Sequence, residues 1–396
     1  MSIEPREYRE RRRRFAERIS AADKDAAVVI SRGGGTFDRF ANVFYLTGHY
    51  QSYSYLPETP GLFTGRSHAA LVVSASDEAM LCVSVPEIDP DRVAVDEVRY
   101  GDDFAATIAK ACRDLRADPA RLAVVGHDVM PAQMWLRLRE LLGFKALHDL
   151  EDELAELRRI KSPAEQSLVR AAAASGRRAV TTFLQMIRPG TSEAEAVAAA
   201  TSTAVADGAG VYFAAVSSGP QSGYYSATPL PGYGTRRLKD GDLVRLDLGI
   251  VLDGYLCDFG RTAVVGTPSG DQERLWVTLT EVLDRVIDCL SPGMATADLV
   301  AVGDEALASA GVGMPTAGPS GMYASYPAHW GHGLGLGWER PWLVGSEPLT
   351  LEPGMVLAIE RAITLDGVGT AAAEQNLLLT ESGAELLTAG PGGRWT

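Results

Sequence analysis

The 396-residue chain has few cysteines, no long apolar run and fewer basic than acidic residues. Its four cysteines lie far apart without a C-x-x-C pair, which predicts free thiols in a reducing compartment. No apolar stretch reaches the length of a membrane span, and the arginine-rich segment Arg11–Arg14 lacks the apolar core of a signal peptide. The net charge of −14 argues against nucleic acid or an acidic membrane surface as a partner. We therefore expect a cytoplasmic protein.

The length predicts two domains, each with its own core. In the first part, strands alternate with helices, which is typical of a small α/β domain. Near Arg158 the pattern changes, because Ser162-Pro163-Ala164-Glu165 forms a capping box that opens a long alanine-rich helix. We therefore expect domains over residues 1–157 and 158–396. In the first domain we expect helices at 5–22, 103–116 and 132–142, and strands at 26–31, 42–47, 69–74 and 122–125.

The second part repeats one pattern, two helices followed by a hairpin that carries acidic residues. The first copy has helices that begin near Pro163 and Glu193, and the second has helices at 271–290 and 296–310. This order predicts an α+β domain with an internal pseudo-duplication. The two hairpins are expected at 243–262 and 355–380.

In the first hairpin, the dipeptide Asp253-Gly254 favours a two-residue type I′ turn. With that turn, Asp247 lies opposite Gly260 and Asp258 lies opposite Gly249. Because side chains alternate between the two faces of a strand, both carboxylates fall on one face as diagonal neighbours, roughly 7–8 Å apart at Cα. They repel each other unless a positive charge lies between them. The hairpin therefore indicates either a metal-binding pair or a solvated polar face.

In the second hairpin, Glu360 and Glu374 interrupt two apolar strands around the loop Asp366–Gly369. A loop of odd length centred on Gly367 places the two glutamates opposite each other, whereas a two-residue turn at 366–367 places them on opposite faces. We therefore predict a longer loop or a bulge here. The alternative is that Glu374 is a surface residue on an edge strand.

A histidine flanked by glycines, His332 in Gly331–Gly335, can approach other backbone closely. Four carboxylates contribute about −4 and two divalent cations about +4, so the cluster can be buried only with metal present. Oxygen-rich coordination with one imidazole suits manganese, cobalt, iron or zinc. We therefore expect two divalent metal ions held by the acidic hairpins and this histidine.

The five residues, in this order and spacing, resemble those of the pita-bread metallopeptidases, which include Xaa-Pro dipeptidase, Xaa-Pro aminopeptidase and methionine aminopeptidase. Residues 258–262 look like the family's D-x-x-R-T signature, and residues 154–165 look like its linker into the catalytic domain. Residues 1–155 are similar to the creatinase-type N-terminal domain. The resemblance implies an α/β creatinase-type domain followed by an α+β pita-bread domain, and the metal ligands Asp247, Asp258, His332, Glu360 and Glu374.

The resemblance also implies the roles of the site. Asp258 and Glu374 would bridge the two metal ions, and Glu360 would accept a proton from a metal-bridging water that acts as the nucleophile. The protein would be a homodimer, and His49 of one subunit could enter the pocket of its partner.

Three positions depart from the pattern of the peptidases: Leu230 and Trp338 stand where these carry histidines, and Ala372 stands where prolidases carry an arginine. Glu360-Arg361 replaces the family's Glu-Pro. The loss of one positioned donor to an oxyanion can cost 10²–10³ in rate, about 3–4 kcal/mol. We therefore expect an atypical substrate, with His329, Tyr224 or Tyr225 as replacement donors. The expected substrate-binding residues are His49, Tyr224, Tyr225, Trp330, Trp338 and Arg361.

Three functions fit these residues. The first is a metal-dependent hydrolase of the Xaa-Pro peptidase type that acts on a short peptide or small molecule. The second is a relative that acts on a small cationic metabolite, as the family's dimethylsulfoniopropionate lyases do. Its cation would sit in an aromatic cage, although the same rings are also suited to hydrophobic packing. The third is a binding protein without catalysis. The cage would comprise Tyr224, Tyr225, Trp330, Trp338 and Trp342.

Overall fold

The structure, a computed structural model, divides into two compact units, residues 2–158 and residues 159–396. It describes residues 3–33, 37–51, 67–223, 231–313, 321–324, 329–390 and 392–395. In these ranges, no helix combines the length and the apolar character needed to cross a membrane. From the sequence we expected the division between residues 157 and 158.

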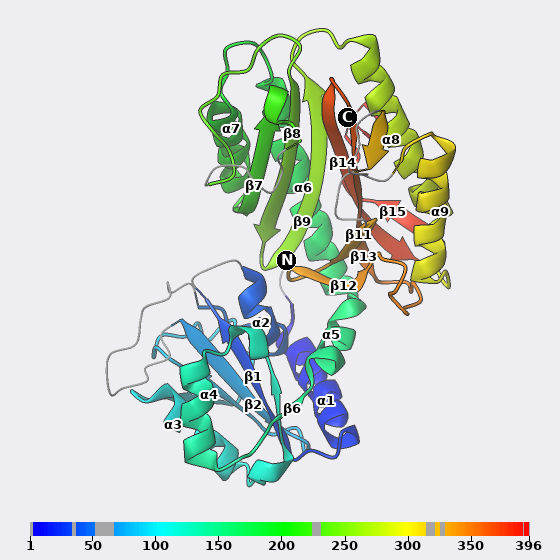
Figure 1. Ribbon diagram of the computed structural model, residues 1–396. Helices are drawn as coiled ribbons and strands as arrows, with labels where there is room; N and C mark the ends of the chain where they lie inside the picture. The colour runs from blue at the N-terminus through cyan, green and yellow to red at the C-terminus, as the bar shows by residue number, and fades with distance from the viewer. Residues whose placement is uncertain are drawn as a thin grey trace. The chain divides into compact units, whose positions relative to one another are not determined.

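The first unit is a six-stranded mixed sheet with helices packed against it, which confirms the predicted α/β class (Figure 1). The strand order is β4-β3-β2-β1-β5-β6, with β1 antiparallel to β2 and parallel to β5. Strands β1 and β2 are buried along almost their whole length, as expected for apolar runs at the centre of a sheet. The elements are α1 Pro5–Ala21, β1 Ala26–Arg32, α2 Ala41–Thr47, β2 His68–Ser74, β3 Ala79–Val83, β4 Glu97–Tyr100, α3 Phe104–Asp114, β5 Leu122–Val125, α4 Ala132–Leu142, β6 His148–Asp149 and α5 Glu151–Arg159.

One predicted element in this unit is wrong. The segment expected as a strand at 42–47 is the helix α2, which ends at Gly48 with a φ of 74°. A short apolar run cannot be assigned to strand or buried helix by its periodicity alone. Glycine in the left-handed region just after the run is the signal of a helix C-terminus.

The second unit has the predicted duplicated arrangement of helices and hairpins (Figure 1). A three-stranded sheet, β7-β8-β9, accompanies α6 and α7, and a second sheet, β12-β11-β13-β14-β15 with β10 on β13, accompanies α8 and α9. The elements are α6 Pro163–Gln185, α7 Glu193–Ala206, β7 Gly210–Ser218, β8 Leu243–Leu252, β9 Tyr255–Val264, α8 Gly270–Cys289, α9 Thr296–Ser309, β10 Met322–Ala324, β11 Gly331–Leu334, β12 Trp338–Trp342, β13 Val356–Leu365, β14 Gly369–Thr380 and β15 Gly383–Leu386.

Capping boxes begin three of these helices. Ser162, Ser192 and Ser269 each accept a hydrogen bond from the backbone three residues later, and the Glu or Gln at that position bonds back to the serine N–H. Each such N-cap stabilises its helix by about 1 kcal/mol. Helix α6 then approaches β9 closely at Gly176, where an added Cβ would lie 2.8 Å from Sγ of Cys257. The glycine therefore lets α6 pack directly behind the strand that carries Asp258.

Candidate metal centre

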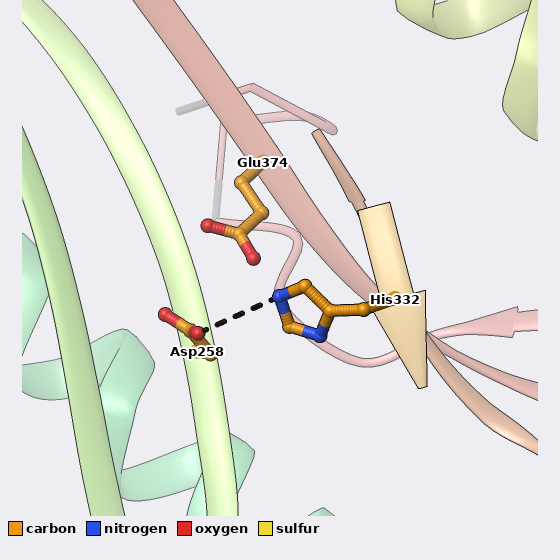
Figure 2. A group of neighbouring side chains, drawn as sticks. All are labelled: Asp258, His332 and Glu374. Carbon is orange, nitrogen blue, oxygen red and sulfur yellow. Dashed lines mark ion pairs between the residues drawn. The ribbon is translucent and has the colours of Figure 1, made fainter. Parts of the chain in front are cut away.

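Three side chains from three strands converge in the second unit. Figure 2 shows Asp258 on β9, His332 on β11 and Glu374 on β14 pointing toward one another. One ligand atom from each lies within 4.8 Å of the other two, and all three side chains are buried. Nε2 of His332 is 4.0 Å from Oδ2 of Asp258 and 3.8 Å from Oε1 of Glu360. Ligands about 2.1 Å from a shared ion are separated by distances of this order.

The first hairpin has the predicted register. Asp253 and Gly254 have φ values of 48° and 88°, as a type I′ turn requires, and Asp247 pairs with Gly260 while Asp258 faces Gly249. Both carboxylates therefore lie on the same face of the sheet. This face lines the cavity in which Asp258 meets His332.

The second hairpin also has the predicted pairing of its glutamates. Its loop has three residues, Asp366–Val368, with φ of 77° at Gly367, and Glu360 pairs directly with Glu374. The prediction of a loop longer than two residues is confirmed. Glu374 is buried, so the alternative of a surface position on an edge strand does not hold.

Side chains hold β9 against β14. Thr262 accepts from the backbone N–H of Ala372 and donates to its carbonyl, and Arg261 donates to the carbonyl of Glu374 at 2.6 Å. Asn376 accepts from the N–H of Asp258 and donates to its carbonyl. The arginine and threonine of the D-x-x-R-T segment thus fix the two acidic strands side by side (Figure 1).

His332 has the tautomer that a metal ligand needs. Its Nδ1 lies 3.0 Å from the carbonyl of Gly333, which can only accept, so Nδ1 carries the proton and Nε2 presents a lone pair to the carboxylates. Burial lowers the pKa of His332 to about 4, which keeps the imidazole neutral.

The carboxyl groups are poorly suited to being ionised together without a cation. Burial and the neighbouring carboxylates raise the pKa of Asp258 and Glu374 well above the usual range. Burial and Asp247 raise the pKa of Glu360 to about 8. Oδ1 of Asp258 and Oε1 of Glu374 are buried, and neither has a hydrogen-bond partner among the described residues. Orphaned carboxylate oxygens beside a neutral imidazole fit divalent metal ions.

The cluster lines a cavity of about 730 Å³. This volume lies within the range of small-molecule and short-peptide sites. Arg245, Ala362 and Ala372 line it beside the acidic residues, so no guanidinium comes from position 372. His329, Trp338 and Trp342 also line it.

Trp338 contacts the centre directly. Its indole N–H donates to Oδ2 of Asp258 at 2.5 Å, and its ring lies 5.9 Å from that of His332. Trp342 lies at the same ring distance, 5.9 Å, from His332. The residue that stands where a histidine was expected therefore acts on a candidate metal ligand.

His329 lies 3.6 Å, through Nδ1, from Oε1 of Glu360. The same Nδ1 accepts from the N–H of Gly331, so the neutral ring carries its proton on Nε2. Burial, followed by the charge of Arg361, lowers the pKa of His329. His329 thus presents its unprotonated Nδ1 toward Glu360, and its N–H is on the other ring nitrogen, Nε2.

Two other predicted substrate contacts have structural partners. Trp330 is 1% exposed, belongs to the core beneath β13 and donates its indole N–H to Asp304, so the expectation that it forms part of a substrate cage is not met. Its ring packs closely against Gly303 of α9, where an added Cβ would lie 2.3 Å from the nearest ring atom. Arg361 donates to the carbonyl of His329 at 2.8 Å and stacks on Trp330 at 5.0 Å.

His49 lies in the first unit, 3% exposed, with its ring 5.8 Å from that of Phe40. Burial lowers its pKa to about 4. Its expected entry into a partner's pocket stays a prediction. Tyr224, Tyr225 and Leu230 lie outside the described residues.

The sequence reasoning missed two residues of the site. Arg245 precedes Asp247 by two positions, and Asn376 follows Glu374 by two, so the strand alternation that placed the acids places these residues on the same faces. A charged or amide residue within an otherwise apolar strand was the available signal.

Comparisons with known proteins match both units. Residues 167–381 match the sequence profile of metallopeptidase family M24, and residues 11–160 match that of the creatinase/prolidase N-terminal domain.

Among individual relatives, a probable dipeptidase, PepE, of Mycobacterium tuberculosis is 32% identical over 269 residues, which are 67% of this chain and 68% of that protein. A Xaa-Pro dipeptidase of Pyrococcus furiosus is 30% identical over 252 residues, 63% of this chain and 69% of that protein. The crystal structure of dipeptidase PepE from Mycobacterium ulcerans has 27% identity and a TM-score of 0.77, and the match covers 99% of this chain and 98% of that one.

Proposed function

The chain belongs to metallopeptidase family M24, and from this premise we propose that it is a metal-dependent hydrolase that cleaves short Xaa-Pro peptides. The observation that carries the proposal is the convergence of acidic side chains and one neutral histidine on a single cavity, with orphaned carboxylate oxygens. The comparisons give no support to a lyase acting on a cationic metabolite or to a binding protein without catalysis.

We propose that Asp247, Asp258, His332, Glu360 and Glu374 hold two divalent ions, manganese, cobalt, iron or zinc, with Asp258 and Glu374 between them. Such ions supply Lewis-acid chemistry, since they polarise a carbonyl and make water a stronger acid. We further propose a homodimer, which the family resemblance implies, and a cytoplasmic location, which the sequence composition favours.

Residues around the ions would accept and donate the protons of the reaction. We propose that Glu360 accepts a proton from the attacking water. We propose that His329 donates a proton from Nε2 to the developing oxyanion or to the leaving amine. The side chain of Trp338 is bonded to Asp258, so we assign it to holding that carboxylate.

The test is an assay of proline release from Xaa-Pro dipeptides by metal-free protein reloaded with each of the four metals in turn. We expect turnover with at least one metal and two ions bound per chain by elemental analysis. Asp258→Asn and Glu374→Gln should lose both bound metal and turnover. A reloaded protein with two bound ions and no turnover of any Xaa-Pro dipeptide would contradict the proposal.

A further inference from the structure

Arg245 is a basic residue on the face of β8 that carries Asp247. It precedes Asp247 by two positions, so both side chains lie on the same side of the sheet. Arg245 pairs with Ser217 of the neighbouring strand β7 on one side and with Thr262 of β9 on the other.

These pairings extend across the second hairpin. Thr262 is hydrogen-bonded to the backbone of Ala372 in both directions, and Ala372 pairs with Ala362. Two parallel rows therefore run across the five strands, separated by two residues, about 6.6 Å along each strand. We call them the ligand row (Ala215, Asp247, Gly260, Glu374 and Glu360) and the arginine row (Ser217, Arg245, Thr262, Ala372 and Ala362).

The arginine row has one charged member. The other four residues of this row are alanine, serine and threonine, and their small side chains leave room for a ligand beside the ligand row. Arg245 is 8% exposed and lines the cavity. Its Nη1 donates to the carbonyl of Ser222 at 2.9 Å, and Oγ of Ser217 donates to the same carbonyl at 3.3 Å, so the guanidinium is held in place.

The second arginine at the cavity is directed elsewhere. Arg361 shares its strand face with Ile359 and Ile363, which belong to the core, and its guanidinium contacts the carbonyl of His329 and the ring of Trp330. Of the two arginines that line the cavity in the described part of the chain, Arg245 is thus the one on the same strand face as Asp247. A planar guanidinium pairs best with a carboxylate, to which it can donate two parallel hydrogen bonds.

We propose that Arg245 binds the free carboxylate of the substrate, so that the enzyme acts on dipeptides whose C-terminal residue directly follows the scissile bond. The inference rests on the proposed function. If the scissile carbonyl lies at the ligand row and the peptide runs toward the arginine row, the carboxylate of the next residue lies about 3.8 Å, one residue, closer to the arginine row. It then lies between the two rows, within reach of the arginine side chain. A longer peptide would place a neutral amide there.

The experiment compares alanyl-proline with alanyl-prolinamide, which lacks only the carboxylate charge. Turnover of both is measured with the manganese-loaded wild type, Arg245→Met, Arg245→Lys and the control Arg170→Met, which removes an exposed arginine paired with Glu385. We expect the wild type and the control to prefer the acid. Arg245→Met should lower kcat/KM for the acid about 10- to 100-fold more than for the amide. The preference of Arg245→Lys for the acid should lie between those of the wild type and Arg245→Met.

A wild type that does not prefer the acid would overturn the proposal. An Arg245→Met variant would also overturn it if its kcat/KM fell equally for the acid and the amide, or if it kept the wild-type preference for the acid. Since a carboxylate also binds metal directly, the change on substitution is the deciding quantity. Melting curves of the variants separate loss of folding from loss of recognition.

A second measurement distinguishes failure of the proposed peptidase function from failure of the proposed role of Arg245. If no variant turns over either compound, binding of intact alanyl-proline and alanyl-prolinamide to the manganese-loaded protein is measured by calorimetry. Tighter binding of the acid that weakens about 10- to 100-fold in Arg245→Met supports Arg245 as the carboxylate site without peptidase activity. Equal binding of both compounds overturns it.

Discussion

Trp338 and Trp342 flank His332 at the same ring distance, but Trp338 also donates to Asp258. Partners of this kind orient a metal ligand and withdraw part of its charge. At the residue scale, we therefore expect the candidate metal centre to depend also on side chains outside the five proposed ligands.

Removing the indole N–H should weaken metal binding while the ring packing persists. We expect Trp338→Phe to lower the affinity for Mn²⁺ about 10- to 100-fold, because Asp258 loses its donor. Trp342→Phe is the matched control and should have a much smaller effect. Equal losses in the two variants, measured by metal titration of the metal-free protein, would show that the ring and not the hydrogen bond matters.

His329 should act in turnover and not in metal retention. We expect His329→Ala to lower kcat about 10²- to 10³-fold with little change in KM, because a positioned donor is lost. Bound metal, measured by elemental analysis, should stay at the wild-type level. A variant that has lost its metal would instead mean that His329 supports the ligands.

At the scale of elements, the loop between β13 and β14 sets the pairing of Glu360 with Glu374. Deleting Val368 shortens this three-residue loop by one, and a shift of one residue turns a strand's side chains to the opposite face. We expect the deletion variant to bind no metal, by elemental analysis, even where circular dichroism shows a folded protein.

Gly367→Ala is the matched control for this loop. Apart from its chain neighbours, no atom of the described residues lies within 4 Å of a Cβ at this position. Because φ is 77°, the substitution should still cost about 1 kcal/mol of stability, and the metal should be kept. If the deletion variant retained wild-type metal content, the strand register would not be what assembles the site.

The sequence was sufficient for the registers of both hairpins, because turn length and side-chain alternation fix which residues face each other. It was insufficient for residues 42–47, where a short apolar run forms a helix and not a strand. It also could not reveal the bond from Trp338 to Asp258, since β12 and β9 meet only in the folded unit. Contacts between distant strands depend on packing, which local patterns do not encode.

At the scale of the whole molecule, we expect the clustered carboxyl groups to link stability to metal and pH. Glu360 keeps its proton to about pH 8 in the folded metal-free protein, against an ordinary value of 4.5. Between these values the folded state binds more protons than the unfolded state, so the free energy of unfolding falls as pH rises. Metal ions that bind the folded state add stability by mass action.

We therefore expect the stabilisation by metal, the difference in Tm between loaded and metal-free protein, to increase from about pH 5.5 to about pH 8.5. Thermal melts with manganese or with a chelator measure it. Glu374→Gln, which removes one of the crowded carboxylates, should make the metal-free protein less sensitive to pH. A stabilisation independent of pH would contradict a protonated metal-free cluster.

The hydrogen bond from Trp338 to Asp258 also makes the molecule its own optical probe. The fluorescence of an indole depends on the electric field around it. An ion bound to Asp258 would change the field at Trp338, because the two side chains are hydrogen-bonded. Fluorescence emission of the unlabelled protein should therefore shift on loading, and the shift should be smaller in Trp338→Phe than in Trp342→Phe. Occupancy could then be followed in real time without dye or radioisotope.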